Sequence, residues 1–470
     1  MKTALMFDSW TIRHGADMAE STPANVAHLL RRAAFGGRPE EIDALVGRDL
    51  GGIVDELYDT SRAPDAGEPP RFDTGFEAYA PEALQLWWFR LAATSATPAI
   101  ERLNWFWQGH FATSDVKVES SYLMHRQFVT LRRIGLGRIE DLLLAMTLDP
   151  AMNVWLDLHL SEVGAPNENY ARELMELFSM GADNGYSQQD VVEVGRSLTG
   201  YRLDERAPTY VVRDVRLLPE FHDYTDKTVL GRTGNWSADD VVAIIAARPE
   251  TSTFIARRLW LRYAGTTGSE RVIGRMAGAL RDGTVFDALK VMLTDDEFYS
   301  DEVKQGLVVQ PVELVVRVAR NFALPVTRLS LDDLRLDYDS EWPEHVETAM
   351  YMVWWCDRMG QRVAYPPNVA GWPHNESWID ASHMAARVQT GRDAGWFVMS
   401  DEMDGSPVGA ELARIDSPDR LAEALLRQFG LVEWSDATFQ AVRRAADADG
   451  WTAHDQAFAA AFYSPEVTFS

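Results

Sequence analysis

The chain has 470 residues, of which 46% are hydrophobic. That fraction supports the core of a large folded body and excludes a disordered chain. Acidic residues outnumber basic ones, 71 to 45, so the formal net charge is −26. A charge of this sign repels phosphate backbones and anionic lipid surfaces, so general nucleic-acid binding and membrane-surface binding are disfavoured.

The single cysteine, Cys356, lies in an apolar run. It allows no intrachain disulfide or cysteine-based zinc site, and we expect it to be a small buried hydrophobic residue. No apolar run reaches the length of about 18 residues that a transmembrane helix needs. The first 20 residues lack the basic and apolar regions of a signal peptide, and no hydrophobic core follows Arg31-Arg32. A cytoplasmic protein is therefore the default expectation, with export still open.

Helix signals dominate the first part of the chain. Thr22 and Pro23 combine an N-cap residue with a proline at the first helical position, and apolar residues with helical spacing follow. Several prolines and glycines in residues 60–80 predict a surface loop. Residues 81–148 contain three helical stretches, the middle one rich in aromatic side chains.

Strand signals are sparse by comparison. Ser187 with Asp190 and Ser237 with Asp240 resemble capping boxes that begin further helices. Residues 209–218 predict a short hairpin or β-arm. No β–α alternation is present, so a doubly wound sheet is disfavoured. We therefore expect a mainly all-α fold, a large multi-helix body with long loops and at most a short β-hairpin.

The composition changes after residue 400, where Asp, Gly, Ser and Pro mix in residues 401–418. This change predicts a linker. The chain then divides into an N-terminal arm (residues 1–21), a main helical domain (residues 22–400), and a linker with a C-terminal helical segment packed on the main body (residues 401–470).

A polar stripe is the most informative pattern. Asn169, Arg172, Glu173 and Glu176 stand at i, i+3, i+4 and i+7, within an arc roughly 100° wide on an otherwise apolar helix. If the arc is buried, the two carboxylates can share a proton for acid–base catalysis and Arg172 can hold an anion. If the arc faces water, it is a solvated face with an i,i+4 pair such as Glu168–Arg172, worth ~0.3–0.5 kcal/mol.

Two histidines are further candidates. His110 lies among aromatic residues, where desolvation favours the neutral imidazole of a general base or metal ligand, or of a core histidine bonded to a carbonyl. His222, beside Asp223, opens a loop and is either a substrate-binding residue or part of a turn. A metal site would require Glu173 and Glu176 to meet one of these imidazoles, and the sequence identifies no metal or cofactor.

A stiff loop at residues 365–373, Y-P-P-N-V-A-G-W-P, contains the last candidates. Asn368 and Trp372 are interpreted as substrate-binding residues. Trp372 and Trp378 would either form a stacking platform for a sugar ring or fasten the loop to the body. The chain has neither the glycine–lysine order of a P-loop nor a G-x-S-x-G elbow.

Four blocks of sequence give the chain a resemblance to a bacterial family, the domain of unknown function 1800 family. The blocks are residues 105–114, residues 167–200, residues 222–223 with 227–231, and residues 359–378. The resemblance runs from about Val26 to Gly391, with mild departures at Ser179, Met180 and Tyr201.

The resemblance implies only a broad function, because genes of this family often look paired with those of a family similar to sulfatases and alkaline phosphatases. That pairing implies a shared pathway on a glycan, sulfate or phosphate ester. One hypothesis is a hydrolase-like or lyase-like enzyme on a polar, glycan- or ester-type substrate; the alternative is a non-catalytic helical scaffold that binds a sulfatase-like partner protein. The enzyme hypothesis assigns catalysis to Glu173, Glu176 and His110, and substrate binding to Asn169, Arg172, His222, Asn368 and Trp372.

Overall fold

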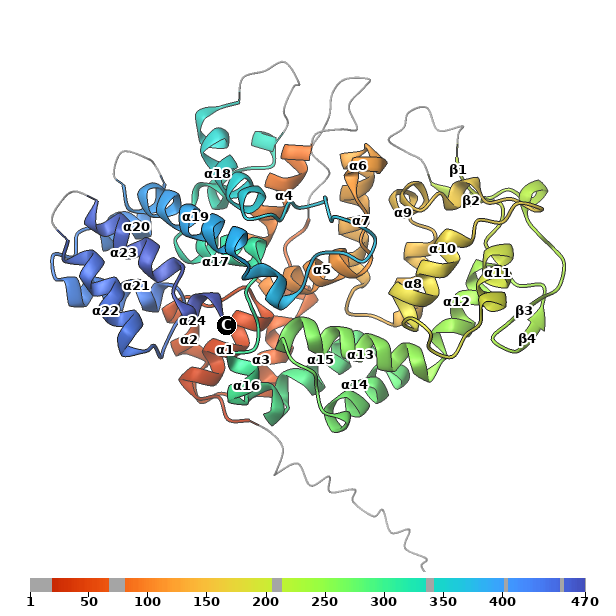
Figure 1. The fold of residues 1–470 in the computed structure, drawn as a ribbon, viewed down its shortest axis with the longest axis horizontal. Helices are drawn as coiled ribbons and strands as arrows, with labels where there is room; N and C mark the ends of the chain where they lie inside the picture. The colour runs from red at the N-terminus through yellow and green to blue at the C-terminus, as the bar shows by residue number, and fades with distance from the viewer. Residues whose placement is uncertain are drawn as a thin grey trace, which may run out of the picture.

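The structure is a computed structural model, and it describes residues 19–66, 81–204, 214–334, 342–400, 405–448 and 452–469. Within these residues the chain forms 24 α-helices and two short antiparallel sheets of two strands each, so the predicted all-α class is confirmed (Figure 1). No helix in the described residues is both long and apolar enough to cross a membrane.

The helices of the first 200 residues are mostly short. They are α1 (Pro23–Ala33), α2 (Pro39–Leu45), α3 (Leu50–Leu57), α4 (Pro81–Thr94), α5 (Pro98–His110), α6 (Asp115–Val118), α7 (Ser121–Ile134), α8 (Ile139–Thr147), α9 (Pro150–Trp155), α10 (Glu168–Glu173) and α11 (Gln188–Ser197). Thr22 caps α1 as predicted, because its hydroxyl accepts the N–H of Asn25. The capping box of Ser187 and Asp190 begins α11. Between these helices, α10 continues directly into a π-helical segment, Leu174–Ser179.

The remaining helices follow the two sheets. They are α12 (Ala238–Ala246), α13 (Pro249–Ala264), α14 (Glu270–Asp282), α15 (Val285–Thr294), α16 (Asp301–Lys304), α17 (Pro311–Asn321), α18 (Glu344–Arg358), α19 (Ala381–Met399), α20 (Pro407–Leu412), α21 (Pro418–Gln428), α22 (Asp436–Ala446), α23 (Ala453–Phe462) and α24 (Pro465–Thr468). The second predicted capping box, Ser237 with Asp240, begins α12. The connection between α18 and α19 runs across to the start of α6, where the N–H of Asp115 donates to the carbonyl of Ala364 (Figure 1).

The first sheet pairs β1 (Tyr201–Leu203) with β2 (Val215–Leu217). Of the predicted hairpin, residues 209–213 lie outside the described residues, and β2 falls in the remainder. The second sheet pairs β3 (Lys227–Val229) with β4 (Arg232–Gly234), in a segment that the sequence indicates as a loop. Strands of three residues are too short for a recognisable alternation of apolar and polar residues.

Helix α5 lies at the centre of the fold. Nearly all of its residues are buried, as expected of a helix that is enclosed on every side. Trp107 belongs to one large hydrophobic core and Trp105 to a second, so α5 joins the two cores. The cysteine, Cys356, is buried in the second core, as the sequence predicts.

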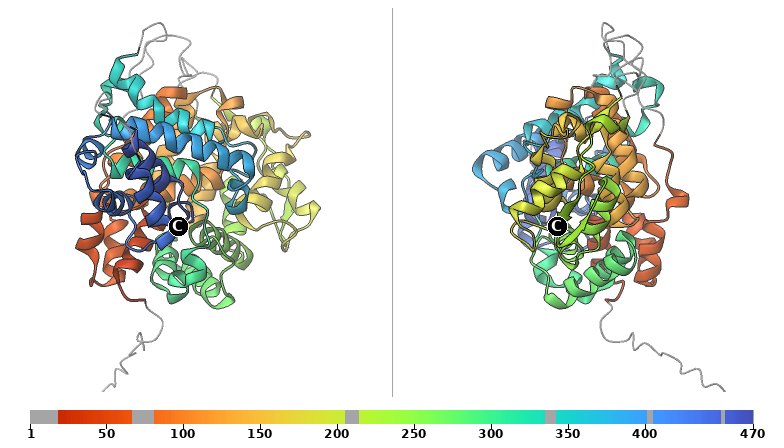
Figure 2. Two further views of the ribbon diagram at one scale, coloured as in Figure 1. Left: turned by 60° about the vertical axis from the view of Figure 1, so that its left-hand side comes forward. Right: turned by 90° about the vertical axis from the view of Figure 1, so that its right-hand side faces the viewer.

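The C-terminal helices contact the N-terminal ones. The guanidinium of Arg31 in α1 donates to the carbonyl of Gly430 at 3.2 Å, and the amide of Asn321 in α17 donates to the carbonyl of Gln428 at 2.9 Å. The rotated views in Figure 2 show these C-terminal helices, in blue, against the rest of the body. The division of the chain at residue 400 stays a prediction.

Candidate functional site

His110, the last residue of α5, is 2% exposed and held by a single hydrogen bond. Its Nε2 lies 3.0 Å from the carbonyl oxygen of Phe178, in the last turn of the π-helical segment, where carbonyls lack helical partners. A carbonyl only accepts, so Nε2 carries the proton and Nδ1 keeps a lone pair. That Nδ1 is buried and has no hydrogen-bond partner among the described residues.

Burial makes this imidazole neutral. Burial and the positive charge of Arg258 together lower the pKa of His110 to about 3, although the hydrogen bond to Phe178 opposes the shift. At neutral pH the ring is therefore an uncharged acceptor of fixed orientation, with one nitrogen available to a ligand or to a proton.

A second neutral imidazole belongs to His374, in the connection between α18 and α19. Burial, together with the charges of Arg262 and Arg258, lowers its pKa to about 4. It is hydrogen-bonded to the main chain of Leu261, whereas its buried Nε2 has no partner within the described ranges. His374 thus resembles His110: one ring nitrogen is hydrogen-bonded to the main chain, and the other has no hydrogen-bond partner in the described residues.

Two arginines one turn apart on α13 accompany the histidines. Arg262 donates through Nη2 to Gln310 Oε1 at 2.5 Å and Glu313 Oε1 at 2.5 Å. Its Nη1 and the Nε of Arg258 are buried without partners in the described part of the chain. Burial lowers the pKa of Arg258, and it lowers that of Arg262 to about 10 even though Glu313 opposes the shift. Both guanidiniums are charged at neutral pH.

These groups line one cavity of about 50 Å³. Its polar walls are His110, His374, Arg258, Arg262 and Gln310, and Trp372 is among the apolar ones. The volume holds on the order of three water molecules or one small oxyanion. The cavity is therefore lined by two neutral histidines and two arginines, each with a buried nitrogen that has no hydrogen-bond partner in the described residues.

The loop that carries His374 is fixed at a backbone crossing. Gly371 has a φ of +87°, and a Cβ atom at this position would lie 2.1 Å from the carbonyl oxygen of Gly109 in α5. The carbonyl of Pro373 accepts from Gln310 Nε2 at 3.2 Å and from the indole of Trp378 at 2.9 Å. Only a glycine permits this close approach at positive φ.

The two tryptophans and Asn368 of this loop have different environments. Trp378 is 1% exposed, so it fastens the loop to the body and offers no stacking face. Trp372 is half-buried and lines the cavity with His110. The side chain of Asn368 accepts the N–H of Ala370 at 2.9 Å, which forms a local turn in an exposed position.

Several buried guanidiniums surround one buried carboxylate beside the cavity. Glu313 is buried, and its carboxylate lies 3.1 Å from Arg102 and 2.5 Å from Arg262. Burial alone would raise the pKa of Glu313, but these two arginines with Arg317 and Arg32 hold it below its ordinary value. Glu313 is one carboxylate shared by several buried guanidiniums, and buried charge is costly unless it is compensated.

The polar stripe of α10 lies elsewhere. Asn169 is exposed, and the side chain of Arg172 is 40% exposed. Arg172 donates to Gln188 Oε1 at 2.9 Å and lies 3.7 Å from Glu168. These contacts are those of a solvated helix face, the second of the two interpretations of the sequence.

The stripe's two glutamates, Glu173 and Glu176, are half-buried. Partial burial and the charge of Glu176 raise the pKa of Glu173, while Arg172 opposes the shift. None of the four stripe residues lines the cavity of His110. The structure thus brings His110 and Trp372 together, and the catalytic role of the glutamates stays a prediction.

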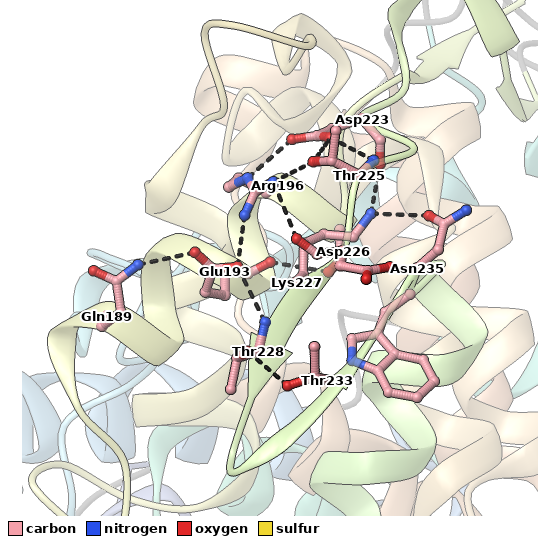
Figure 3. Close-up of polar contacts among 12 residues, drawn as sticks. Gln189, Glu193, Arg196, Asp223, Thr225, Asp226, Lys227, Thr228, Thr233 and Asn235 are labelled. Atoms are coloured by element: carbon pink, nitrogen blue, oxygen red, sulfur yellow. Dashed lines mark hydrogen bonds and ion pairs between the residues drawn. The ribbon is translucent and has the colours of Figure 1, made fainter.

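His222 is also outside the cavity. Its Nδ1 lies 2.7 Å from the carbonyl oxygen of Thr199, and its neighbour Asp223 belongs to a separate polar network (Figure 3). In that network Arg196 bridges Glu193 Oε2 at 2.7 Å and Asp223 Oδ2 at 2.9 Å.

The network of Arg196 is closed by Lys227. This buried ammonium donates to the carbonyl oxygen of Asp223 and to Asn235 Oδ1 at 3.3 Å. Although burial opposes it, hydrogen bonds from Thr225 and the charge of Arg196 lower the pKa of Asp223 to about 2. The charges are matched inside the network, so it fastens the β3–β4 hairpin to α11. Across the described ranges, no three His, Cys, Asp or Glu side chains gather as a metal site would require.

The sequence interpretation missed four polar residues of the cavity, Arg258, Arg262, Gln310 and His374. A usable signal existed for three of them. His374 lies in the block of residues 359–378, and the two arginines have i,i+4 spacing on an amphipathic helix, the same kind of pattern that indicated the stripe.

The fold and the cavity together define a mainly helical protein with a small cavity lined by two histidines and two arginines. The chain belongs to the family described as "Protein of unknown function (DUF1800)", whose model matches residues 28–469. This range extends past Gly391, where the resemblance carried by the motifs ends, and it includes every residue of the cavity. No match was found among the curated proteins or among the solved structures.

Proposed function

We propose that the cavity binds an anionic oxygen group of a polar, ester-type substrate and that the protein is a hydrolase-like enzyme with His110 as its general base. The observation that carries the proposal is the set of unpartnered polar atoms around one cavity: the Nδ1 of His110, the Nε2 of His374, the Nε of Arg258 and the Nη1 of Arg262. Buried polar atoms are normally hydrogen-bonded, so four such atoms on the residues of one cavity are candidates to contact a ligand.

The chemistry follows from these groups. Arg258 and Arg262 would bind the negative oxygens and stabilise the charge that develops on them in the transition state. A water molecule held by His110 would give a proton to Nδ1 as its oxygen attacks the ester centre, and that proton would then pass to the departing oxygen. A bound anion would also raise the pKa of His110 toward the range of an effective base, because a negative charge favours the imidazolium.

The test compares Arg258→Gln with a matched control on the same helix. Arg257→Gln removes a guanidinium that pairs with Glu270 at an exposed position, 2.7 Å away. Inorganic phosphate and sulfate should raise the melting temperature of the wild type, since a ligand of the folded state stabilises it by mass action. The Arg257 variant should keep this response, and the Arg258 variant should lose about tenfold in affinity by calorimetry.

Catalysis needs a separate measurement. The wild type and His110→Gln are assayed with nitrophenyl acetate, phosphate and sulfate. Turnover that His110→Gln abolishes, with the fold intact, supports a general base. Absence of phosphate and sulfate binding, or equal binding by the Arg258 variant, would refute the anion site itself.

The alternative, a scaffold for a sulfatase-like partner, is favoured by the half-exposed stripe of Glu173 and Glu176 on α10, which a partner can reach. A scaffold predicts that no ester is hydrolysed and that His110→Gln changes stability only. It also predicts that exchanging Glu173 and Glu176 for glutamine weakens co-purification with the partner.

A further inference from the structure

A second hollow, of about 300 Å³, lies between α18 and α19, and the buried Trp355 of the second core forms part of its lining. We name it the α18–α19 hollow. Its other lining residues are Tyr351, Trp354 and Arg358 from α18, and Arg392, Asp393 and Trp396 from α19. It shares no residue with the cavity of His110.

Two indole rings of the α18–α19 hollow face solvent. Trp354 is 49% exposed and Trp396 is 38% exposed, although both are large apolar side chains. Tyr351 also lines the hollow, and its ring centroid lies 5.2 Å from that of Trp354 and 5.0 Å from that of Phe397. Clustered, exposed aromatic rings around a concave surface mark a binding site more often than chance exposure does.

The hollow is lined by more basic than acidic side chains. The guanidinium of Arg358 forms an ion pair with Asp393, and Asp393 also accepts from Gln389 Nε2 at 2.9 Å. Arg392 is exposed, and no acceptor for it is found in the described part of the chain. The lining therefore carries two guanidiniums against one carboxylate, with one guanidinium available to a ligand.

We propose that the α18–α19 hollow binds an acidic sugar residue of the uronic-acid type within a glycan. The apolar C–H face of a pyranose ring stacks on an indole, as other flat apolar surfaces do. Asp393 accepts hydrogen bonds from sugar hydroxyls, and Arg392 binds the sugar carboxylate as a fork of two donors. The volume lies at the lower end of the range for small-molecule sites.

Charge selects this ligand over another that suits aromatic rings. A quaternary ammonium ligand would suit the aromatic rings but would meet two guanidiniums. A sugar with one carboxylate matches both the aromatic faces and the single available guanidinium.

The test titrates the full chain with trigalacturonic acid, with a hyaluronan tetrasaccharide and with neutral maltotriose, by calorimetry and tryptophan fluorescence. At least one acidic oligosaccharide should bind at millimolar concentration or below. Trp396→Ala should weaken that binding about tenfold, and Arg392→Gln should remove the preference for the acidic sugar over maltotriose.

Arg444→Gln is the matched control, because it removes an exposed arginine on α22 and should leave the binding unchanged. The melting temperatures of Arg392→Gln and Arg444→Gln should match that of the wild type, since these two side chains are exposed. Trp396 is 38% exposed, so binding by Trp396→Ala is measured at a temperature at which that variant is folded. Failure of both acidic sugars to bind, or binding that Trp396→Ala leaves intact, overturns the proposal.

Discussion

Replacing His110 by glutamine should make the protein less sensitive to acid. In the folded chain the imidazole is buried and donates only to the carbonyl of Phe178. A glutamine amide can still donate to that carbonyl but has no proton to gain near neutral pH. The exchange therefore removes the titration of this position while keeping a donor in place.

The size of the effect follows from the pKa of His110, which burial and Arg258 lower from 6.5 to about 3. Below pH 6.5 the unfolded chain takes up a proton here and the folded chain does not. The neutral imidazole therefore makes its full contribution to the free energy of unfolding above pH 6.5. That contribution is lost as the pH falls toward 3. At pH 5 the loss corresponds to about 1.5 pKa units, or about 2 kcal/mol.

The assay is urea unfolding of the wild type and His110→Gln at pH 7.5 and pH 5. Relative to His110→Gln, the wild type should have an unfolding free energy about 2 kcal/mol lower at pH 5 than at pH 7.5. Acidic groups elsewhere titrate in both proteins, so their contribution cancels. A difference that does not change with pH would mean that the imidazole accepts a proton in the folded chain, and the assignment of a neutral base would be wrong.

Three further exchanges test other parts of the structure. Gly371→Ala should cost about 2–4 kcal/mol in denaturant unfolding, whereas Gly231→Ala, which has positive φ but open space around it, should cost only about 1 kcal/mol; equal costs would contradict the backbone crossing. Arg196→Met leaves two carboxylates without their cation and should cost about 2 kcal/mol, and an unchanged melting temperature would show that the network does not stabilise the hairpin. Glu173→Gln should lower turnover at constant melting temperature if this carboxylate acts as an acid or base, and full turnover would remove it from the mechanism.

Local features of the fold could be predicted because they depend on residues close in sequence. The cap at Thr22 and the capping boxes of Ser187 and Ser237 need only a hydroxyl or carboxylate three residues from a free N–H. The helical class follows from the spacing of apolar residues.

The site depends on contacts between distant segments, and the spacing of residues along a single helix does not predict these contacts. His110, Arg258 and His374 are separated by more than 100 residues, and they meet because α5, α13 and the α18–α19 connection cross at one place. The stripe around Arg172 and the arginine pair of α13 have the same i,i+4 spacing. Only the elements packed against each helix decide which of the two faces water, and one sequence does not contain that information.

The arginines around Glu313 affect how a ligand approaches the cavity. Arg32, Arg102 and Arg317 are each 1% exposed, so their positive charges are included in the formal total of −26 but lie away from the solvent. The outer surface carries most of the chain's large excess of acidic side chains. An incoming oxyanion is repelled at long range before it reaches the attractive interior, and dissolved ions shorten the reach of this repulsion. Its association rate constant should accordingly rise with ionic strength, which is the opposite of the trend for a ligand drawn in by a complementary surface.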